Sequence, residues 1–356
     1  MKNLYFYSLD LIRANQAANG AYVASPTFPT YRYCWFRDGA YIAYAMDLAG
    51  DHASAERFYE WAAATVRARA EAVERAILSA AAGQPAPEDL LHTRYTLDGA
   101  VGADEWPNFQ LDGFGTLLWG MAEHLRLSHA RMPDGWRAAA DLLARYLGAL
   151  WRQPCYDCWE EFAEHVHTST LAAIYGGLLA AAPLLGDDAP ARDAAAIRQF
   201  VLRHCVSGGS LVKFVGSGAV DASLVHAATP YRLLGPGDPL MRAAVERIES
   251  ELRRDGGGVH RYAADSYYGG GEWVLLTAYL GWHYVERGEP ARARALLDWV
   301  AAQADEQGHL PEQVAAHLNQ PEMLPVWEQR WGTSARPLLW SHAAYVTLAT
   351  RLGVQA

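Results

Sequence analysis

The fold is decided by residues 169–205, which read STLAAIYGGLLAAAPLLGDDAPARDAAAIRQFVLRHC. The first part, 169–182, is apolar nearly all round, as expected of a helix that is buried on both sides. A short connection, Leu185-Gly186-Asp187-Asp188, leads to a second segment, 189–205, which carries Arg and Asp on one face as an outward helix does. These residues therefore predict an inner helix joined by a short turn to an outer helix.

The same alternation extends along the chain, where helical periodicity dominates and no convincing run of alternating strand residues occurs. Twelve helices are expected, at 3–18, 38–49, 52–72, 112–128, 134–150, 169–182, 189–205, 219–227, 239–254, 271–287, 290–304 and 338–352. Those at 112–128, 169–182, 271–287 and 338–352 are apolar or aromatic nearly all round, whereas those at 52–72, 134–150, 189–205, 239–254 and 290–304 have one charged face. Twelve helices that alternate in this way predict an all-α fold, an (α/α)6 barrel of six inner and six outer helices.

The connections between the expected helices also alternate. Those from an inner to an outer helix are short, whereas most of those from an outer to an inner helix are long and rich in Trp, Tyr, Gly and acidic residues. The long ones cover 19–37, 73–111, 151–168, 206–218, 255–270 and 305–337. In an alternating barrel these six loops open at one end, where function is expected. No linker is visible, so we expect residues 1–356 to form a single domain.

The charge of the chain excludes some classes of binding partner. The 356 residues include 30 Lys+Arg and 40 Asp+Glu, a net charge of −10, and only two of the cations are lysines, Lys2 and Lys213. An acidic chain of this kind is not expected to bind nucleic acid or an anionic membrane. The uncharged run 166–186 is long enough to span a bilayer, but Pro183 and Gly186 break its end, so a buried helix is favoured. Four cysteines and no signal-peptide core predict a cytoplasmic protein.

Five of the long loops contain aromatic side chains beside carboxylates, amides or guanidinium groups. The C–H faces of a sugar ring stack on Trp and Tyr, and its hydroxyls pair with bidentate acceptors and donors. These loops therefore predict a carbohydrate site. The candidate binding residues are Tyr31, Trp35, Arg37, Asp38, Trp106, Gln110, Trp159, Glu161, Arg261, Tyr262, Asp265, Tyr267, Trp273 and Trp340.

Five motifs in order resemble the catalytic domain of glycoside hydrolase family 15, the group of glucoamylases, glucodextranases and bacterial trehalases. They are YRYCWFRDG at 31–39, WPNFQLDG at 106–113, YDCWEE at 156–161, RYAADSYYGGGEW at 261–273 and HLPEQV at 309–314. The resemblance runs from about Tyr31 to Leu352 and implies an (α/α)6 barrel, in agreement with the helix pattern. The β-sandwich domain that precedes the barrel in bacterial relatives is not expected here, because the first expected helix begins almost at Met1.

The resemblance also implies roles for individual residues. Glu160 corresponds to the general acid and Glu312 to the general base of an inverting glycosidase. The resemblance implies that Tyr31 helps to hold the nucleophilic water, and that Arg37 and Asp38 bind the hydroxyls of the non-reducing glucose. Trp106, Trp159 and Arg261 resemble residues of the first two sugar sites, and Glu161 lies near the leaving sugar. Aromatic burial by Trp159 and the charge of Glu161 are expected to raise the pKa of Glu160.

The choice of substrate remains open at this point. We expect isomaltose or short isomalto-oligosaccharides, as in the stand-alone isomaltose glucohydrolases of this family, with trehalose and maltose as alternatives. The long segment Asn319 to Arg336, with Trp327 and Trp331, is expected to wall the pocket. A phosphorylase or a non-catalytic glycan-sensing protein on the same barrel are two further alternatives. No cofactor or metal is expected, and the pair Cys155 and Cys158 lacks the partners that would complete a zinc site.

Overall fold

The structure is a computed structural model that describes residues 3–83 and 85–354. The chain divides into two compact units, and each is described by itself. The first unit comprises Met1–Asn15, Ala24–Arg32 and Val206–Ala356, and the second comprises Gln16–Val23 and Tyr33–Cys205.

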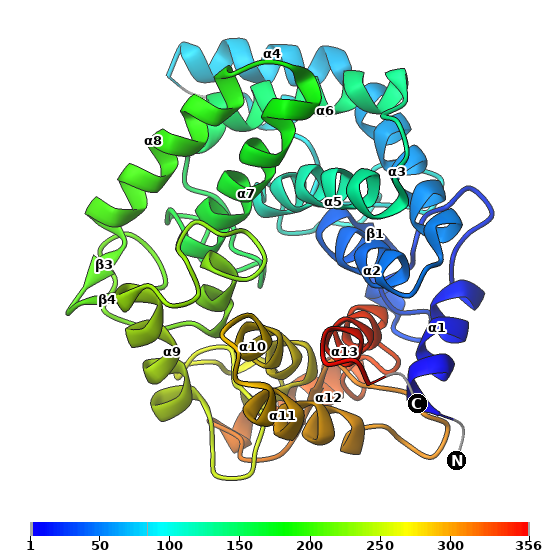
Figure 1. Cartoon of the computed structure of the whole chain (residues 1–356), viewed down its shortest axis with the longest axis vertical. Helices are drawn as coiled ribbons and strands as arrows, with labels where there is room; N and C mark the ends of the chain where they lie inside the picture. Colours follow the sequence, from blue (N-terminus) through cyan, green and yellow to red (C-terminus); the bar gives the residue numbers. More distant parts are fainter. Residues whose placement is uncertain (1–2, 84, 355–356) are drawn as a thin grey trace. The chain divides into compact units, whose positions relative to one another are not determined.

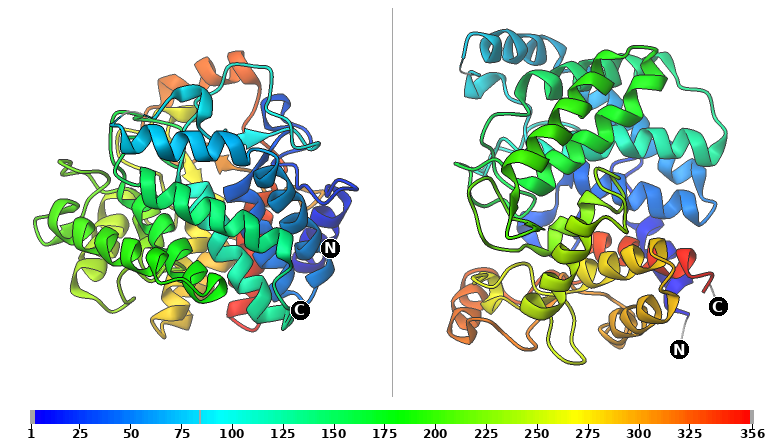
Figure 2. Two further views of the ribbon diagram at one scale, coloured as in Figure 1. Left: turned by 90° about the horizontal axis from the view of Figure 1, so that it is seen from above. Right: turned by 60° about the vertical axis from the view of Figure 1, so that its left-hand side comes forward.

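Seven α-helices make up most of the described part of the second unit. They are α2 (Phe36–Leu48), α3 (His52–Arg67), α4 (Ala70–Ala81), α5 (Asp112–Ser128), α6 (Asp134–Leu150), α7 (Thr168–Leu185) and α8 (Ala189–His204). Helices α2, α5 and α7 are buried on nearly all sides, and α5 packs against both of the others (Figure 1). Helices α3, α6 and α8 bury one face each, and α6 and α8 lie side by side (Figure 2). The inner and outer helices predicted from the sequence are therefore confirmed in this unit.

Two glycines explain how closely the inner helices approach. A Cβ atom on Gly115 of α5 would lie 2.4 Å from the carbonyl oxygen of Ala173, and one on Gly177 of α7 would lie 2.3 Å from the carbonyl oxygen of Gly115. Real Cβ atoms do not come this near to backbone oxygen, so α5 and α7 can only cross here with glycine at both positions.

The first unit also alternates between buried and half-buried helices. Its α-helices are α1 (Leu4–Ala14), α9 (Pro239–Leu252), α10 (Val274–Glu286), α11 (Pro290–Ala302), α12 (Leu324–Trp331) and α13 (Leu339–Arg351). Helices α10 and α13 are buried on nearly all sides and pack against each other, whereas α1 and α11 cover them and bury one face each. Helix α12 buries no residue and contacts the short 3-10 helices η4 (Tyr267–Gly269) and η5 (Pro321–Met323).

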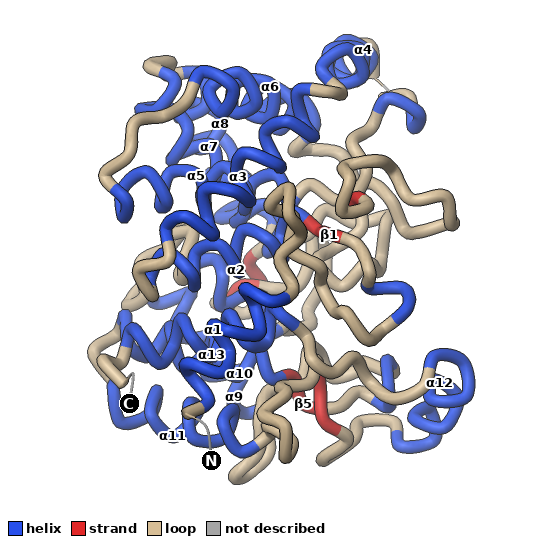
Figure 3. The backbone as a smooth tube through the Cα atoms, turned by 90° about the vertical axis from the view of Figure 1, so that its right-hand side faces the viewer, coloured by secondary structure: helices blue, strands red, loops and turns tan. Residues whose placement is uncertain are grey.

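Short strands fix the loops that precede the inner helices. In the second unit, β1 (Cys34–Trp35) pairs with β2 (Arg94–Tyr95), antiparallel and with Trp35 opposite Arg94. In the first unit, β5 (Glu272–Trp273) pairs with β6 (Gln313–Val314), with Trp273 opposite Gln313, and β3 (Val206–Ser207) pairs with β4 (Ser210–Leu211). Figure 3 shows β5 among the loops of the first unit. The strands place Trp35 and Trp273 directly before α2 and α10, which begin at the next residue.

Three sequence predictions of local structure were wrong. Residues 219–227 do not form an α-helix, because the Asp221 side chain accepts a hydrogen bond from the backbone N–H of Ser223 and a 3-10 helix, η3 (Ala222–Ala227), follows instead. Helix α4 lies in a segment that was expected to be a loop beyond residue 72. Helix α12 was missed as well, because it is short and has no buried face to produce a periodic pattern.

The apolar run 166–186 forms α7. Among the residues that the structure describes, Thr168–Leu185 is the one helix long and apolar enough to cross a membrane, and 67% of it is buried. It packs between α5 and α8 of the second unit. This burial agrees with the predicted core helix.

Candidate active site

The loop that carries Glu160 is held by one aspartate. The Asp157 Oδ1 atom accepts hydrogen bonds from the backbone N–H groups of Trp159 (2.9 Å) and Glu161 (3.0 Å). The backbone closes the turn as well, since the N–H of Glu160 donates to the Asp157 carbonyl at 2.9 Å. Glu160 lies within this turn at φ +67°, a conformation that non-glycine residues rarely adopt. The turn therefore fixes the direction in which the Glu160 side chain leaves the backbone.

The Glu160 carboxyl lies among N–H donors. The indole Nε1 of Trp35 donates to Glu160 Oε1 at 2.6 Å, and the side chains of Trp106 and Gln110 also lie close enough to interact with it. Burial raises the pKa of Glu160, while the Arg37 charge and the three donors lower it, and the net direction is upward. The carboxyl therefore keeps its proton to a higher pH than an exposed glutamate does.

Arg37 is shared among several acceptors in the same unit. Its Nη1 atom lies 2.8 Å from Gln110 Oε1 and 3.3 Å from Asp112 Oδ2, and its Nε atom lies 3.4 Å from Asp38 Oδ2. All four side chains are buried. Burial raises the pKa of Asp38 to about 6, with Arg37 opposing the shift and Glu160 adding to it, and burial also raises the pKa of Asp112. This cluster is a buried network with one cation and several acidic groups.

Glu312 of the first unit is held by backbone bonds on both sides. Its N–H donates to the Ala335 carbonyl at 2.9 Å, and its carbonyl accepts from the N–H of Val274, the first residue of α10, at 3.2 Å. The side chain is 4% exposed, and its Oε1 atom accepts a hydrogen bond from the Tyr31 hydroxyl at 3.0 Å. The Tyr31 and Tyr267 hydroxyls also lie 3.0 Å apart. Burial, and then the charge of Glu312, raise the pKa of Tyr267 well above its usual range, so this hydroxyl keeps its proton.

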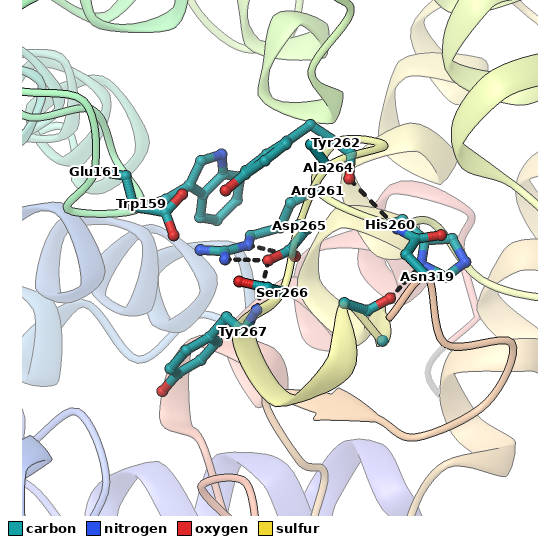
Figure 4. Close-up of polar contacts among 12 residues, drawn as sticks. Trp159, Glu161, His260, Arg261, Tyr262, Ala264, Asp265, Ser266, Tyr267 and Asn319 are labelled. Atoms are coloured by element: carbon teal, nitrogen blue, oxygen red, sulfur yellow. Dashed lines mark hydrogen bonds and ion pairs between the residues drawn. The ribbon is translucent and has the colours of Figure 1, made fainter. Parts of the chain in front are cut away.

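A second cluster of the first unit is organised by Arg261 and Asp265 (Figure 4). The guanidinium pairs with the carboxylate through Nε–Oδ2 at 2.7 Å and Nη2–Oδ1 at 2.5 Å, and both side chains are buried. Oδ1 of Asp265 also accepts the backbone N–H of Tyr267 at 2.9 Å, which sets the start of η4. The Arg261 guanidinium lies 5.1 to 5.5 Å from the ring centres of Tyr262, Tyr267 and Trp273. One arginine therefore orders three aromatic rings.

The sequence model of glycosyl hydrolases family 15 matches residues 3–298. This chain belongs to glycosyl hydrolase family 15. The isomaltose glucohydrolase of Kribbella flavida is 44% identical over 98% of the chain and 92% of that protein. A solved structure of a wild-type glycosidase has 44% identity and a TM-score of 0.95, over 98% of this chain and 96% of that one. The family assignment and the glycoside hydrolase activity predicted from the motifs are therefore confirmed.

The fold class of this family 15 member is confirmed by the structural comparisons as well. A bacterial glucoamylase, solved in complex with acarbose, matches with a TM-score of 0.75 at 20% identity, over 98% of this chain and 55% of that one. At this identity the match concerns the fold alone. The chain has the all-α, (α/α)6-barrel fold of the glucoamylases.

The structure gathers most of the predicted site residues of this family 15 chain into clusters within each unit. In the second unit the contacts join Trp35, Arg37, Asp38, Trp106, Gln110 and Glu160, and the same loop carries Trp159 and Glu161. In the first unit they join Tyr31 with Tyr267 and Glu312, and Arg261 with Tyr262, Asp265, Tyr267 and Trp273. Trp340, by contrast, donates its indole N–H to the Tyr279 hydroxyl of α10. A role of Trp340 in substrate binding stays a prediction.

Sequence reasoning missed three residues that organise these clusters. Asp112 was expected only to start a helix, and the structure adds an ion pair with Arg37. Asp157 was part of a quoted motif, but its turn with Trp159 and Glu161 was not foreseen, although an Asp two residues before a turn is a known signal. Arg94 lies in the long loop 73–111, where no pattern marked it.

The described residues contain no group of three or more His, Cys, Asp or Glu side chains that could hold a metal ion. Cys155 and Cys158 are buried free cysteines, and burial raises the pKa of Cys155 far above its usual range. A raised pKa disfavours the thiolate that a metal ligand or a redox nucleophile requires.

Proposed function

We propose that the chain is an inverting, exo-acting α-glucosidase that releases β-D-glucose from the non-reducing end of isomaltose or short isomalto-oligosaccharides. The choice of the α-1,6 linkage is supported by the 44% identity to a protein named isomaltose glucohydrolase. The observation that carries the proposed chemistry is the contrast between two carboxyl groups. Glu160 has a raised pKa among N–H donors, and Glu312 accepts a hydrogen bond from a tyrosine hydroxyl.

In the proposed reaction, Glu160 donates its proton to the glycosidic oxygen while the bond from this oxygen to the anomeric carbon breaks. A water molecule attacks the anomeric carbon from the opposite face and gives a proton to the Glu312 carboxylate. One displacement of this kind inverts the configuration, so an α-glucoside yields β-glucose. Proton exchange with solvent then restores Glu160 to the acid and Glu312 to the carboxylate.

The neighbouring groups support this assignment of roles. A general acid has to hold its proton near the working pH, and burial in the second unit raises the pKa of Glu160 accordingly. A general base has to be ionised, and the Tyr31 hydroxyl donates to an oxygen of Glu312. In the proposed site, Arg37 and Asp38 bind glucose hydroxyls, and Trp106, Trp159 and Arg261 line the first two sugar sites, with Glu161 near the leaving sugar.

The proposed function is tested by proton NMR of the purified protein with isomaltose, maltose and trehalose in parallel. We expect isomaltose to be consumed fastest and β-glucose to appear before α-glucose. Early α-glucose would contradict the acid and base roles of Glu160 and Glu312. Faster turnover of trehalose or maltose would replace the proposed linkage, and turnover only with added phosphate would replace hydrolysis by phosphorolysis.

We further propose that the enzyme works in the cytoplasm on a small oligosaccharide that has been imported. The four cysteines are all buried and free, as expected in a reducing compartment. Activity measured after fractionation of cells tests this location, and activity mainly outside the cytoplasmic fraction would contradict it.

A further inference from the structure

The second unit contains a fully buried arginine that no step of the proposed reaction uses. Arg94 is 0% exposed and lies in β2, directly opposite Trp35 of β1. Its guanidinium is paired with the carboxylate of Asp104, whose own side chain is 47% exposed. Burial of a cation is costly unless it is paired, and the Asp104 carboxylate supplies the opposite charge of this pair.

Three aromatic rings also lie against the Arg94 guanidinium. Its central carbon lies 3.6 Å from the ring centre of Trp106, 4.0 Å from that of Tyr33 and 5.5 Å from that of Trp35. These distances are within the range of cation–π interaction, which is stronger when the cation is removed from water. The Tyr33 hydroxyl in turn donates to Asp104, so the ion pair and the rings form one connected group.

Two of these rings lie beside Glu160, and one of them, Trp35, is hydrogen-bonded to it. The Trp35 indole donates to Glu160 Oε1 at 2.6 Å, whereas the buried Trp106 Nε1 lies near this carboxyl without a hydrogen bond of normal geometry. The Trp35 and Trp106 rings meet edge to face, with centres 5.9 Å apart and planes at 70°. An indole has its only donor at the ring edge, so the plane of each ring decides where its N–H points.

We propose that Arg94 is a positioning residue for the general acid, acting through Trp106 and Trp35, whose ring planes it fixes so that the Trp35 indole donates to Glu160. This inference rests on the proposed function, because Glu160 is the proton donor only in that reaction. The planar guanidinium is suited to the task, because it stacks on aromatic faces and still pairs with Asp104. A lysine would keep the charge and lose the plane.

A matched control distinguishes the proposed positioning role of Arg94 from a purely structural one. Arg69 also lies over a ring of the β1–β2 pair, 4.5 Å from the ring centre of Tyr95, and donates to the carbonyls of Thr65 and Gly99. None of these three contacts is with Trp35, Trp106 or Glu160. Arg69→Met therefore removes a stacked arginine from the same region without touching the donors of Glu160.

The test compares Arg94→Met, Arg94→Lys and Arg69→Met in isomaltose hydrolysis across pH. We expect Arg94→Met to lower kcat by about tenfold to a hundredfold, since misplaced catalytic groups cost rates of this order, and to change KM by less than about threefold. Looser indole donors favour the Glu160 carboxylate less, so the basic limb of the pH–rate profile is expected to move to higher pH. Arg94→Lys should recover only part of kcat, and Arg69→Met should leave kcat and the basic limb unchanged.

A second readout does not need turnover. The indole N–H resonance of Trp35, identified by its loss in Trp35→Phe, is expected to titrate with Glu160 and to lose this titration in Glu160→Gln. In Arg94→Met we expect its midpoint to move to higher pH, and in Arg69→Met to stay. If Arg94→Met does not fold, Asp104→Asn releases the guanidinium from its exposed side and is expected to shift the midpoint in the same direction by less.

The outcomes separate this inference from the proposed function. A shifted titration in a protein that hydrolyses none of the three disaccharides supports the positioning of Trp35 against Glu160 by Arg94 and contradicts the proposed function. Normal kcat, basic limb and Trp35 titration in Arg94→Met, or the same changes in Arg69→Met, would overturn the role of Arg94.

Discussion

The surroundings of Glu160 and those of Glu312 differ in the chemistry of their donors. Glu160 of the second unit lies in a tight turn at positive φ and faces N–H groups of two indoles and an amide, with Arg37 nearby. Glu312 of the first unit lies in a bend directly before β6, is held by backbone bonds on both sides, and accepts a hydrogen bond from the Tyr31 hydroxyl. One carboxyl is thus supported by rigid rings, and the other by hydroxyls.

This difference fits the two tasks that a proton donor and a proton acceptor have. Burial is the largest influence on Glu160, and it keeps the proton on the acid although the donors oppose it. A hydroxyl can donate to a carboxylate and also accept from a neighbour, as Tyr31 can between Glu312 and Tyr267. The comparison predicts that variants around Glu160 impair protonation of the leaving group, whereas variants around Glu312 impair activation of the water.

The largest expected effect comes from removing each carboxylate in turn. Glu160→Gln and Glu312→Gln are each expected to lower kcat for isomaltose by about 10²- to 10⁴-fold, the usual contribution of a general acid or base. With 4-nitrophenyl α-glucoside, whose leaving group hardly needs a proton, Glu160→Gln should lose much less and Glu312→Gln as much as before. Steady-state kinetics on both substrates checks this, and equal losses of the two variants on both substrates would contradict the division of roles.

The next effect concerns one buried arginine in each unit, Arg261 in the first and Arg37 in the second. Asp265→Asn breaks the two-point pair with Arg261 and removes the charge of the buried carboxylate, so we expect a loss of about 3–5 kcal/mol in the free energy of unfolding. Asp112→Asn leaves Arg37 with Gln110 and Asp38, so a loss of about 1–3 kcal/mol is expected. Urea unfolding of both purified variants checks the order, and a larger loss for Asp112→Asn would contradict it.

Most of the fold could be predicted from the sequence, because burial on all sides and burial on one side leave different patterns in the inner and outer helices. The pattern failed where no core face exists, as in α12, and where local side-chain bonds compete with the helix, as at Asp221. The candidate site residues came from motifs, which carry residue types and order. The partners of Arg94 and Asp112 depend on contacts between segments distant in the sequence, and motifs do not contain these.

A smaller effect distinguishes the surroundings of Glu160 from those of Glu312 by the pH dependence of activity. Trp35→Phe removes the N–H that favours the Glu160 carboxylate, so the pKa of Glu160 is expected to rise. Activity is lost as pH rises through the pKa of the acid, so the basic limb should move to higher pH while kcat falls by about tenfold. Tyr31→Phe should lower kcat as well but leave the basic limb in place. pH–rate profiles of both variants check this, and a downward shift in Trp35→Phe would contradict it.

The smallest expected effect concerns α12 of the first unit and tests whether its tryptophans contribute to substrate binding or to turnover. Trp331 is 37% exposed, whereas Trp327 donates to the Ser266 carbonyl at 3.1 Å and meets the Tyr267 ring with centres 4.8 Å apart. If Trp331 forms part of the second sugar site, Trp331→Ala should raise KM for disaccharides about threefold, as for one lost aromatic contact, and leave 4-nitrophenyl α-glucoside nearly unchanged. Trp327→Ala should instead lower kcat on both substrates, because Tyr267 loses its support beside Tyr31. Equal changes of KM on both substrates in Trp331→Ala would exclude this residue from the second site, and α12 would then act only through Trp327.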